Sequence, residues 1–86
     1  MPVSSMDVVE RIARVIAGRV LSVNAEGEDA SAGDEVDRIW PEFREDAISI
    51  LRTLREPDPA MAGAGDAEIW RRMIEAALSE ADAVAS

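Results

Sequence analysis

The 86-residue chain contains no cysteine, histidine, lysine or tyrosine, and only three of its residues are aromatic. These absences exclude a disulfide, a cysteine–histidine zinc site, and the imidazole, thiol, amine and phenol groups that most enzymes use as bases or nucleophiles. Catalysis by carboxylates alone requires a buried site, and a chain of this length has little interior to provide one. The sequence therefore predicts a protein that is not an enzyme, with no catalytic residues, no cofactor and no metal.

Long apolar runs are also absent. No uninterrupted apolar stretch approaches the roughly 20 residues of a membrane-spanning helix. The first residues, MPVSSMDVVER, lack the basic segment and the apolar segment of a signal peptide. The lack of cysteine fits a reducing compartment. We therefore expect a cytoplasmic protein that does not contact a membrane.

Acidic residues are abundant and concentrated in the middle of the chain. The formal net charge is −9, and the segment from Asn24 to Asp46 alone has nine carboxylates against two arginines, Arg38 and Arg44. The nine carboxylates are Glu26, Glu28, Asp29, Asp34, Glu35, Asp37, Glu42, Glu45 and Asp46. A concentrated field of one sign influences the choice of partner more than it influences the fold. These nine residues are therefore our predicted partner-binding site.

Apolar residues recur at three- and four-residue spacing in three segments, which predicts three amphipathic helices. We expect the main helices near 6–21, 41–56 and 66–82, in a single all-α domain over 1–86 that forms a three-helix bundle. Gly33 to Ile39 are a candidate for a further short helical turn, with Asp34 as its cap. Ser4 or Ser5 is the expected cap of the first helix, and Asp66 that of the third. Pro41 suits a first helical position, and Pro57 to Gly65 is expected to be a compact link.

The helical faces also predict the core. Its expected members are Val9, Ile12, Ile16, Phe43, Ile50, Leu51, Leu54, Ile69, Met73, Ile74 and Leu78. Trp40 and Trp70 are the largest further candidates, although an exposed tryptophan can instead anchor a partner. The acid-before-base pairs Asp7–Arg11 and Glu10–Arg14 are four residues apart, which predicts ion pairs along the first helix.

Periodicity disappears between about residues 23 and 35, where small, acidic and glycine residues predict an acidic loop. Counted from Asn24, three glutamates (Glu26, Glu28 and Glu35) stand at positions three, five and twelve of a helix–loop–helix calcium site. Position six of such a site is normally glycine, but Asp29 stands there. The sequence therefore favours a solvated loop over a calcium site.

Two segments, LRTLREPDPAM and IWRRMIEAAL, resemble small uncharacterised proteins from phages and prophages of alphaproteobacteria. Those proteins combine an Arg-Glu-Pro helix end and a following methionine with a final Trp-x-x-Met-Ile-x-x-Ala-Leu helix. The matching residues are Leu54, Arg55, Glu56, Pro57, Met61, Trp70, Met73, Ile74, Ala77 and Leu78. Asp58-Pro59 departs from the pattern, and the acidic middle is not part of it. The resemblance implies a helical fold, a phage origin and a bacterial cytoplasm, and it carries no known active site.

By size, acidity and lack of catalytic groups, the chain is also similar in type to anti-CRISPR proteins and other phage-encoded inhibitors. Several of these present carboxylates where phosphates would lie. This similarity implies a non-enzymatic inhibitor that binds a basic nucleic-acid-handling protein, such as a CRISPR effector, and blocks its DNA or RNA binding. The alternative is a helical assembly or regulatory module of a phage, which could be homo-oligomeric. Direct nucleic-acid binding is disfavoured, because like charges repel and no basic stripe exists outside the first helix.

Overall fold

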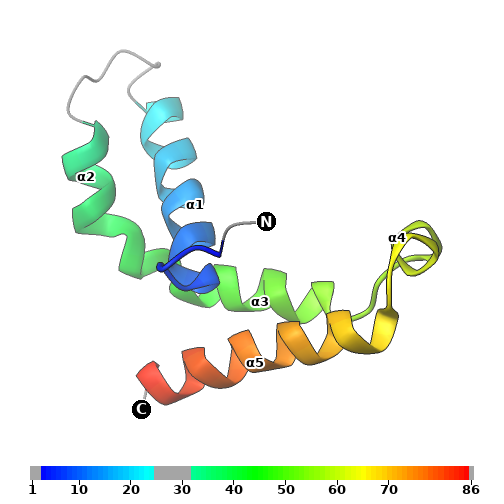
Figure 1. Cartoon of the computed structure of the whole chain (residues 1–86). Coiled ribbons are helices and arrows are strands. Elements are labelled where there is room, and N and C mark those ends of the chain that lie inside the picture. The colour runs from blue at the N-terminus through cyan, green and yellow to red at the C-terminus, as the bar shows by residue number, and fades with distance from the viewer. Residues whose placement is uncertain (1–2, 25–31, 86) are drawn as a thin grey trace. The chain divides into compact units, whose positions relative to one another are not determined.

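The computed structural model describes residues 3–24 and 32–85, and every regular element within these ranges is a helix (Figure 1). The elements are α1 (Val8–Asn24), α2 (Ala32–Ile39), the 3-10 helix η1 (Trp40–Phe43), α3 (Arg44–Leu54), α4 (Pro59–Ala64) and α5 (Ala67–Ala85). The predicted all-α class is confirmed, but the predicted count of three helices is wrong. The chain divides into two compact units, Met1–Ala47 and Ile48–Ser86. The single domain over 1–86 stays a prediction.

Helix α1 begins directly after an aspartate cap. The Asp7 Oδ1 accepts a hydrogen bond of 2.7 Å from the Glu10 backbone N–H, which is the N-cap arrangement and also places a carboxylate at the positive end of the helix dipole. The predicted serine cap is therefore wrong. Ser4 Oγ accepts a hydrogen bond of 3.2 Å from the Met6 N–H, ahead of the helix. The helix then continues to Asn24 instead of ending at residue 21.

The buried side of the first unit follows one face of α1. Val9, Ala13 and Ala17 recur at a spacing of four, and each is at most 2% exposed. Through this region α1 contacts both α2 and η1. Helices α1 and α2 approach each other closely at Gly18, which has no side chain. A Cβ added to Gly18 would lie 3.9 Å from Val36 Cγ2 of α2.

Helix α2 occupies part of the segment that was predicted to be an acidic loop over 23–35. Residues 23–24 belong to the end of α1 and 32–35 to the start of α2, so the loop prediction is wrong at both ends, whereas the candidate helical turn over Gly33 to Ile39 is present as α2. The remainder, 25–31, lies outside the described residues. The charges suit a helix, because Asp34 and Glu35 lie in the first turn of α2 and Arg38 in the last.

The second predicted helix is divided at its beginning. Pro41 lies in the first turn of η1, where its missing N–H removes no helical hydrogen bond. The α-helical part, α3, starts three residues later at Arg44 and ends at Leu54, short of the predicted end at residue 56. Pro57 explains this end, because the residue before a proline is disfavoured in the helical conformation.

The second unit pairs the later part of α3 with α5, which lie side by side (Figure 1). The buried side chains come from both helices and are Ile48, Leu51, Ile74 and Ala81. Asp66 Oδ1 accepts hydrogen bonds from the Glu68 and Ile69 N–H groups at 2.9 and 3.1 Å, which supports the predicted cap of α5. The helix continues to Ala85, beyond the predicted end at residue 82.

Short helix α4 lies within the segment that was expected to be a compact link. Asp58 is its N-cap, with Oδ1 accepting a hydrogen bond of 2.9 Å from the Met61 N–H. Pro59 follows in the first turn. An aspartate cap followed by proline is a helix-start signal, which the sequence interpretation overlooked at this position.

The predicted core is only partly buried. Val9, Leu51 and Ile74 are buried, and four other members are half-buried: Ile12, Ile16, Phe43 and Leu78. The prediction is wrong for the remaining four, which are exposed: Leu54 (36%), Ile50 (41%), Ile69 (48%) and Met73 (63%). All four lie on α3 or α5, whose apolar stripes are wider than the side that one neighbouring helix covers. Both tryptophans are half-buried.

None of the described helices combines the length and the apolar character that crossing a membrane requires.

Candidate functional site

The structure places six of the nine predicted partner-binding residues. Glu26, Glu28 and Asp29 lie outside the described residues. The other six follow one another along α2, η1 and the start of α3: Asp34, Glu35, Asp37, Glu42, Glu45 and Asp46. The acidic segment is therefore helical over most of its described length, and its charges are held on consecutive helices of the first unit.

Two of these six carboxylates are paired with arginine. Asp37 Oδ1 accepts a hydrogen bond of 2.5 Å from Nη1 of Arg14 on α1. Glu35 Oε2 pairs with Nη2 of Arg38, three residues later on the same helix. Each pair removes one negative charge from the field that a partner meets. Asp37 in particular has a structural role, since its pair joins α2 to α1.

Arg14 is the centre of a small network within the first unit. Its Nε donates a hydrogen bond of 2.8 Å to Glu10 Oε2, which confirms one of the two predicted ion pairs along α1. Its guanidinium carbon also lies 5.4 Å from the centre of the Trp40 ring, a distance suited to a cation–π interaction. The hydrogen bonds that Arg14 donates to Asp37, and next to Glu10, raise the pKa of Arg14 above the ordinary arginine value.

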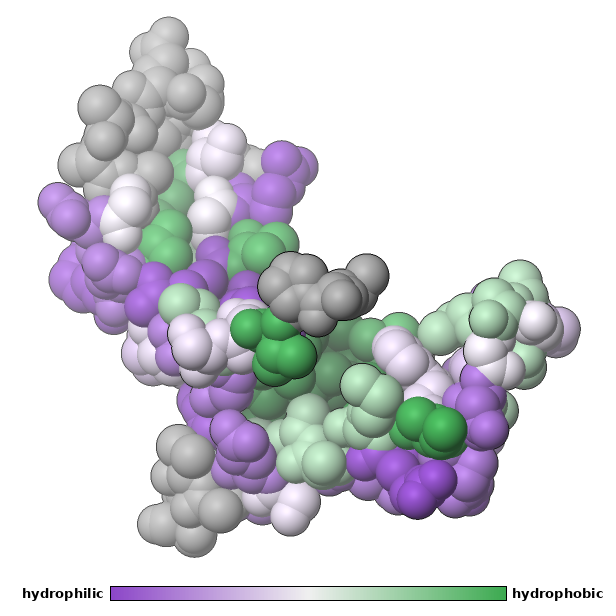
Figure 2. All heavy atoms as spheres, in the orientation of Figure 1, coloured by the Kyte–Doolittle hydropathy of each residue, from purple (hydrophilic) through white to green (hydrophobic). Residues whose placement is uncertain are grey.

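The four remaining carboxylates are exposed and have no ion-pair partner among the described residues: Asp34, Glu42, Glu45 and Asp46. They come from α2, η1 and α3, within a span of 13 residues. Hydrophilic side chains cover the outer side of α2 in the view of Figure 2. We call these four residues the acidic set.

The polar side chains of the described residues are neither buried nor gathered into a carboxylate cluster. None of the polar or charged side chains described in the structure is buried, so no described carboxylate occupies the water-excluded kind of site used in general acid catalysis. Nor do three or more of the described carboxylates gather in a group that could hold a metal ion.

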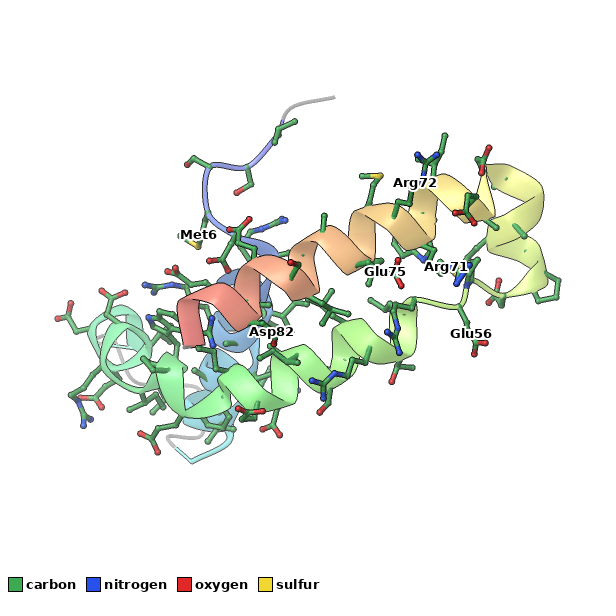
Figure 3. The ribbon with its side chains drawn as sticks, turned by 90° about the horizontal axis from the view of Figure 1, so that it is seen from below. Met6, Glu56, Arg71, Arg72, Glu75 and Asp82 are labelled. Atoms are coloured by element: carbon green, nitrogen blue, oxygen red, sulfur yellow. The ribbon has the colours of Figure 1, made fainter. Side chains whose placement is uncertain are left out.

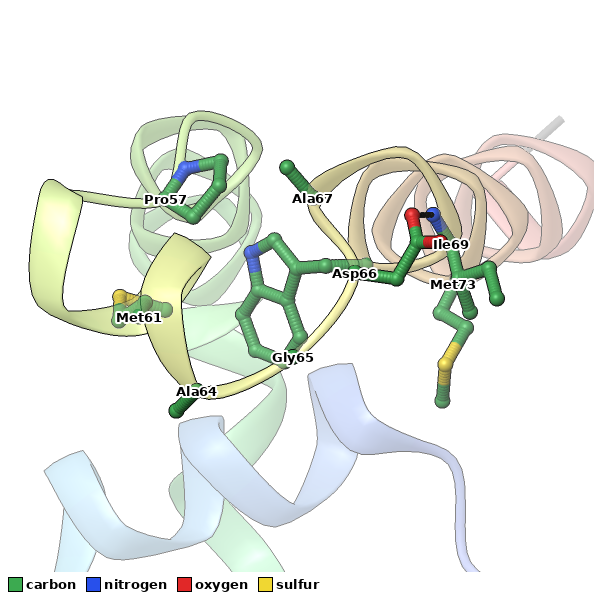
Figure 4. A pocket seen from close by; sticks show the side chains of 9 residues that line it. Pro57, Met61, Ala64, Gly65, Asp66, Ala67, Ile69 and Met73 are labelled. Carbon is green, nitrogen blue, oxygen red and sulfur yellow. Dashed lines mark hydrogen bonds between the residues drawn. The ribbon is translucent and has the colours of Figure 1, made fainter.

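The second unit has an open apolar hollow of about 390 Å³ at the junction of α4 and α5 (Figure 4). Its lining includes Met61 of α4 and Ile69, Trp70 and Met73 of α5. The one carboxylate at its edge, Asp66, is already engaged as the cap of α5. The hollow can therefore receive apolar groups and lacks the convergent polar groups of a small-molecule site. The sequence interpretation missed it because Ile69, Trp70 and Met73 were expected to be buried.

The chain matches no known protein family, and neither the curated proteins nor the solved structures contain a significant match.

Proposed function

We propose that this protein is a non-enzymatic, phage-derived inhibitor that binds a basic nucleic-acid-handling protein and blocks its access to DNA or RNA. A CRISPR effector is one protein of this class. The observation that supports the proposal is the acidic set, four exposed carboxylates without ion pairs among the described residues, within a first unit of formal net charge −6. Charge of this density complements a surface that has evolved to hold phosphates.

Ion pairs reduce the number of carboxylates that we expect to contact a partner. Glu35 and Asp37 are held by arginines, so they contribute less to a partner's field than the acidic set does. Since complementary surface charge acts mainly on the association rate, neutralising the acidic set should slow binding without unfolding the protein. All four side chains are exposed, and surface substitutions usually change stability by about 0.5 kcal/mol or less.

The test compares two variants that remove the same number of charges. The test variant carries Asp34→Asn, Glu42→Gln, Glu45→Gln and Asp46→Asn. The control variant carries Glu56→Gln, Glu68→Gln, Glu75→Gln and Asp82→Asn, which are exposed carboxylates of the second unit. Tagged wild type captures host proteins, and the association rate of each identified nucleic-acid-binding partner is then measured with all three proteins.

We expect wild type and control variant to bind similarly and the test variant to bind at least about tenfold more slowly at low salt. Binding of wild type should weaken steeply with salt, as the Debye length falls from ~10 Å at 0.1 M to ~3 Å at 1 M. DNA or RNA should compete for the same surface of the partner. Equal slowing of both variants, or simultaneous binding of nucleic acid and inhibitor, would contradict the proposal.

A further inference from the structure

Helix α5 carries two parallel rows of residues with the same spacing of four, three and four. The inner row is buried or half-buried: Trp70, Ile74, Ala77 and Ala81. Its first member donates a hydrogen bond to the end of α3. The outer row begins one residue earlier: Ile69, Met73, Ala76 and Glu80. Alternation of three and four residues is the spacing with which helices pair along a continuous seam. The inner row has this spacing on the buried side of α5, and the outer row repeats it on a neighbouring face.

The outer row is exposed over its whole length. Ile69 is 48% exposed and Met73 is 63% exposed, and Ala76 and Glu80 are exposed as well. Hydrophobic side chains gather on the face of α5 seen in Figure 2. Ile69 and Met73 also line the hollow next to Met61, so the apolar surface extends from α5 to α4 (Figure 4). Two large apolar side chains are thus left without a covering helix in their unit.

The charges within and beside the outer row, Glu80 and Arg72, are self-complementary. Arg72 lies four residues before Ala76, and Glu80 lies four residues after it. In Figure 3, Arg72 projects from the side of α5 that faces away from α3. Neither Arg72 nor Glu80 has an ion-pair partner among the described residues. A second α5, laid antiparallel across the first at Ala76, would therefore face each Arg72 with a Glu80.

We propose that the face of α5 that carries the outer row binds the same face of a second copy of this chain, antiparallel and crossing at Ala76. The resulting two-fold interface contains two Arg72–Glu80 pairs, one on each side of the crossing. Ala76 allows close approach because its side chain is small, and Ile69 and Met73 become covered. This inference does not depend on the proposed function, since it concerns the pure protein without any partner.

The predicted dimer is weak. An interface made mainly by one pair of helices lies at the small end of specific interfaces, under about 1,200 Å². We therefore expect a dissociation constant on the order of micromolar or weaker. Residues 67–85 have a formal charge of only −2, while the whole chain has −9. Salt should screen the long-range repulsion between the two copies, so dimerisation should not fall steeply with salt, in contrast to binding of a basic partner.

The first experiment measures mass by sedimentation equilibrium from about 1 μM to about 1 mM, a range that spans micromolar affinity. We expect a monomer–dimer equilibrium for wild type. Met73→Glu should weaken it at least about tenfold, while circular dichroism shows unchanged helix because this side chain is exposed in the monomer. Thr53→Glu, which adds the same charge at an exposed position of α3, should dimerise like wild type. A monomeric wild type at every concentration would overturn the proposal.

A charge exchange tests the antiparallel register and does not depend on the behaviour of Met73→Glu. Arg72→Glu and Glu80→Arg should each weaken dimerisation, because each creates two like-charged contacts. The double variant restores opposite charges at both contacts and should recover the wild-type dissociation constant. If the double variant is as weak as the single variants, the Arg72–Glu80 register is wrong.

Crosslinking provides a second readout, since the native chain has no cysteine. Ala76→Cys places one thiol at the crossing point, where the two copies are near enough for a disulfide. Under mild oxidation we expect this variant to form a covalent dimer faster than Thr53→Cys, whose thiol lies on α3. Equal rates for the two variants would contradict the crossing at Ala76.

Discussion

The indole Nε1 of Trp70 donates a hydrogen bond of 2.6 Å to the carbonyl oxygen of Leu54, the last residue of α3. The final carbonyls of a helix have no intrahelical partner, so this bond satisfies one of them. It also connects the first turn of α5 to the end of α3, the two helices that precede and follow α4 in the sequence. Trp70 thus serves the packing of its unit and, through its ring, the wall of the hollow between α4 and α5 (Figure 4).

Trp70→Phe should destabilise the protein by removing this bond while keeping an aromatic ring. A lost hydrogen bond costs about 0.5–1.5 kcal/mol, and the smaller ring adds a further packing loss. The measurement is urea unfolding followed by far-ultraviolet circular dichroism. An unfolding midpoint equal to that of wild type would mean that the indole N–H contributes nothing to stability.

Ile74→Asp and Ile50→Asp should behave differently, although the sequence predicted both residues to be in the core. Ile74 is 8% exposed, so an aspartate there is buried without a partner and should cost several kcal/mol. Ile50 is 41% exposed, so its aspartate stays solvated and should cost about 1 kcal/mol or less. Thermal melts of the two variants check this, and similar losses in both would contradict the assignment of helix faces.

The sequence predicted the fold class and most helical segments because apolar periodicity and capping residues are local signals. Asp66 and Pro41, for example, lie at helix starts as expected. Asp58-Pro59 was misread as part of a link because proline was weighed as the end of one helix and not as the start of the next. Periodicity also identified the apolar stripes of α3 and α5, but it could not say which side of each stripe a neighbour covers. Ile50 and Met73 were assigned to the core for that reason.

The candidate site shows the same division between local and non-local information. The acidic segment is visible in the sequence, and so is the Glu10–Arg14 pair, because its two residues are one helical turn apart. Arg14 and Asp37 are 23 residues apart in the sequence, so their ion pair depends on how α2 packs against α1. Only the structure could therefore divide the described carboxylates into paired residues and the acidic set.

Arg14→Ala should lower the melting temperature more than Arg11→Ala does. Arg14 contacts Glu10, Asp37 and Trp40, whereas Arg11 is an exposed residue of the same helix. The raised pKa of Arg14 means that its stabilising contribution is complete below the ordinary arginine pKa and is lost only in strong alkali. The difference between the two variants should therefore be the same from about pH 6 to about pH 9. Equal melting temperatures would show that the network is energetically neutral.

Calcium should not bind at a specific site in the segment from Asn24 to Glu35. Asp29 stands where a calcium loop needs a glycine for its sharp turn, and Glu35 is paired with Arg38 on α2. Calorimetric titration should show only weak association of counter-ions with the acidic segment. A saturable site of about micromolar affinity that magnesium does not displace would contradict this prediction and support a calcium-sensing role.

Gly18→Ala should stabilise the first unit. The added Cβ would lie 3.9 Å from Val36 Cγ2, which is an ordinary van der Waals contact, and alanine is favoured over glycine within a helix by about 0.5–1 kcal/mol. Gly63→Ala in α4 is the matched comparison, since nothing lies within 4 Å of its added Cβ. Both variants should unfold at higher urea than wild type. Gly18→Leu should instead unfold earlier, because a large side chain at this position would push α2 away from α1. Stabilisation by leucine would mean that α1 and α2 are not packed closely at this point.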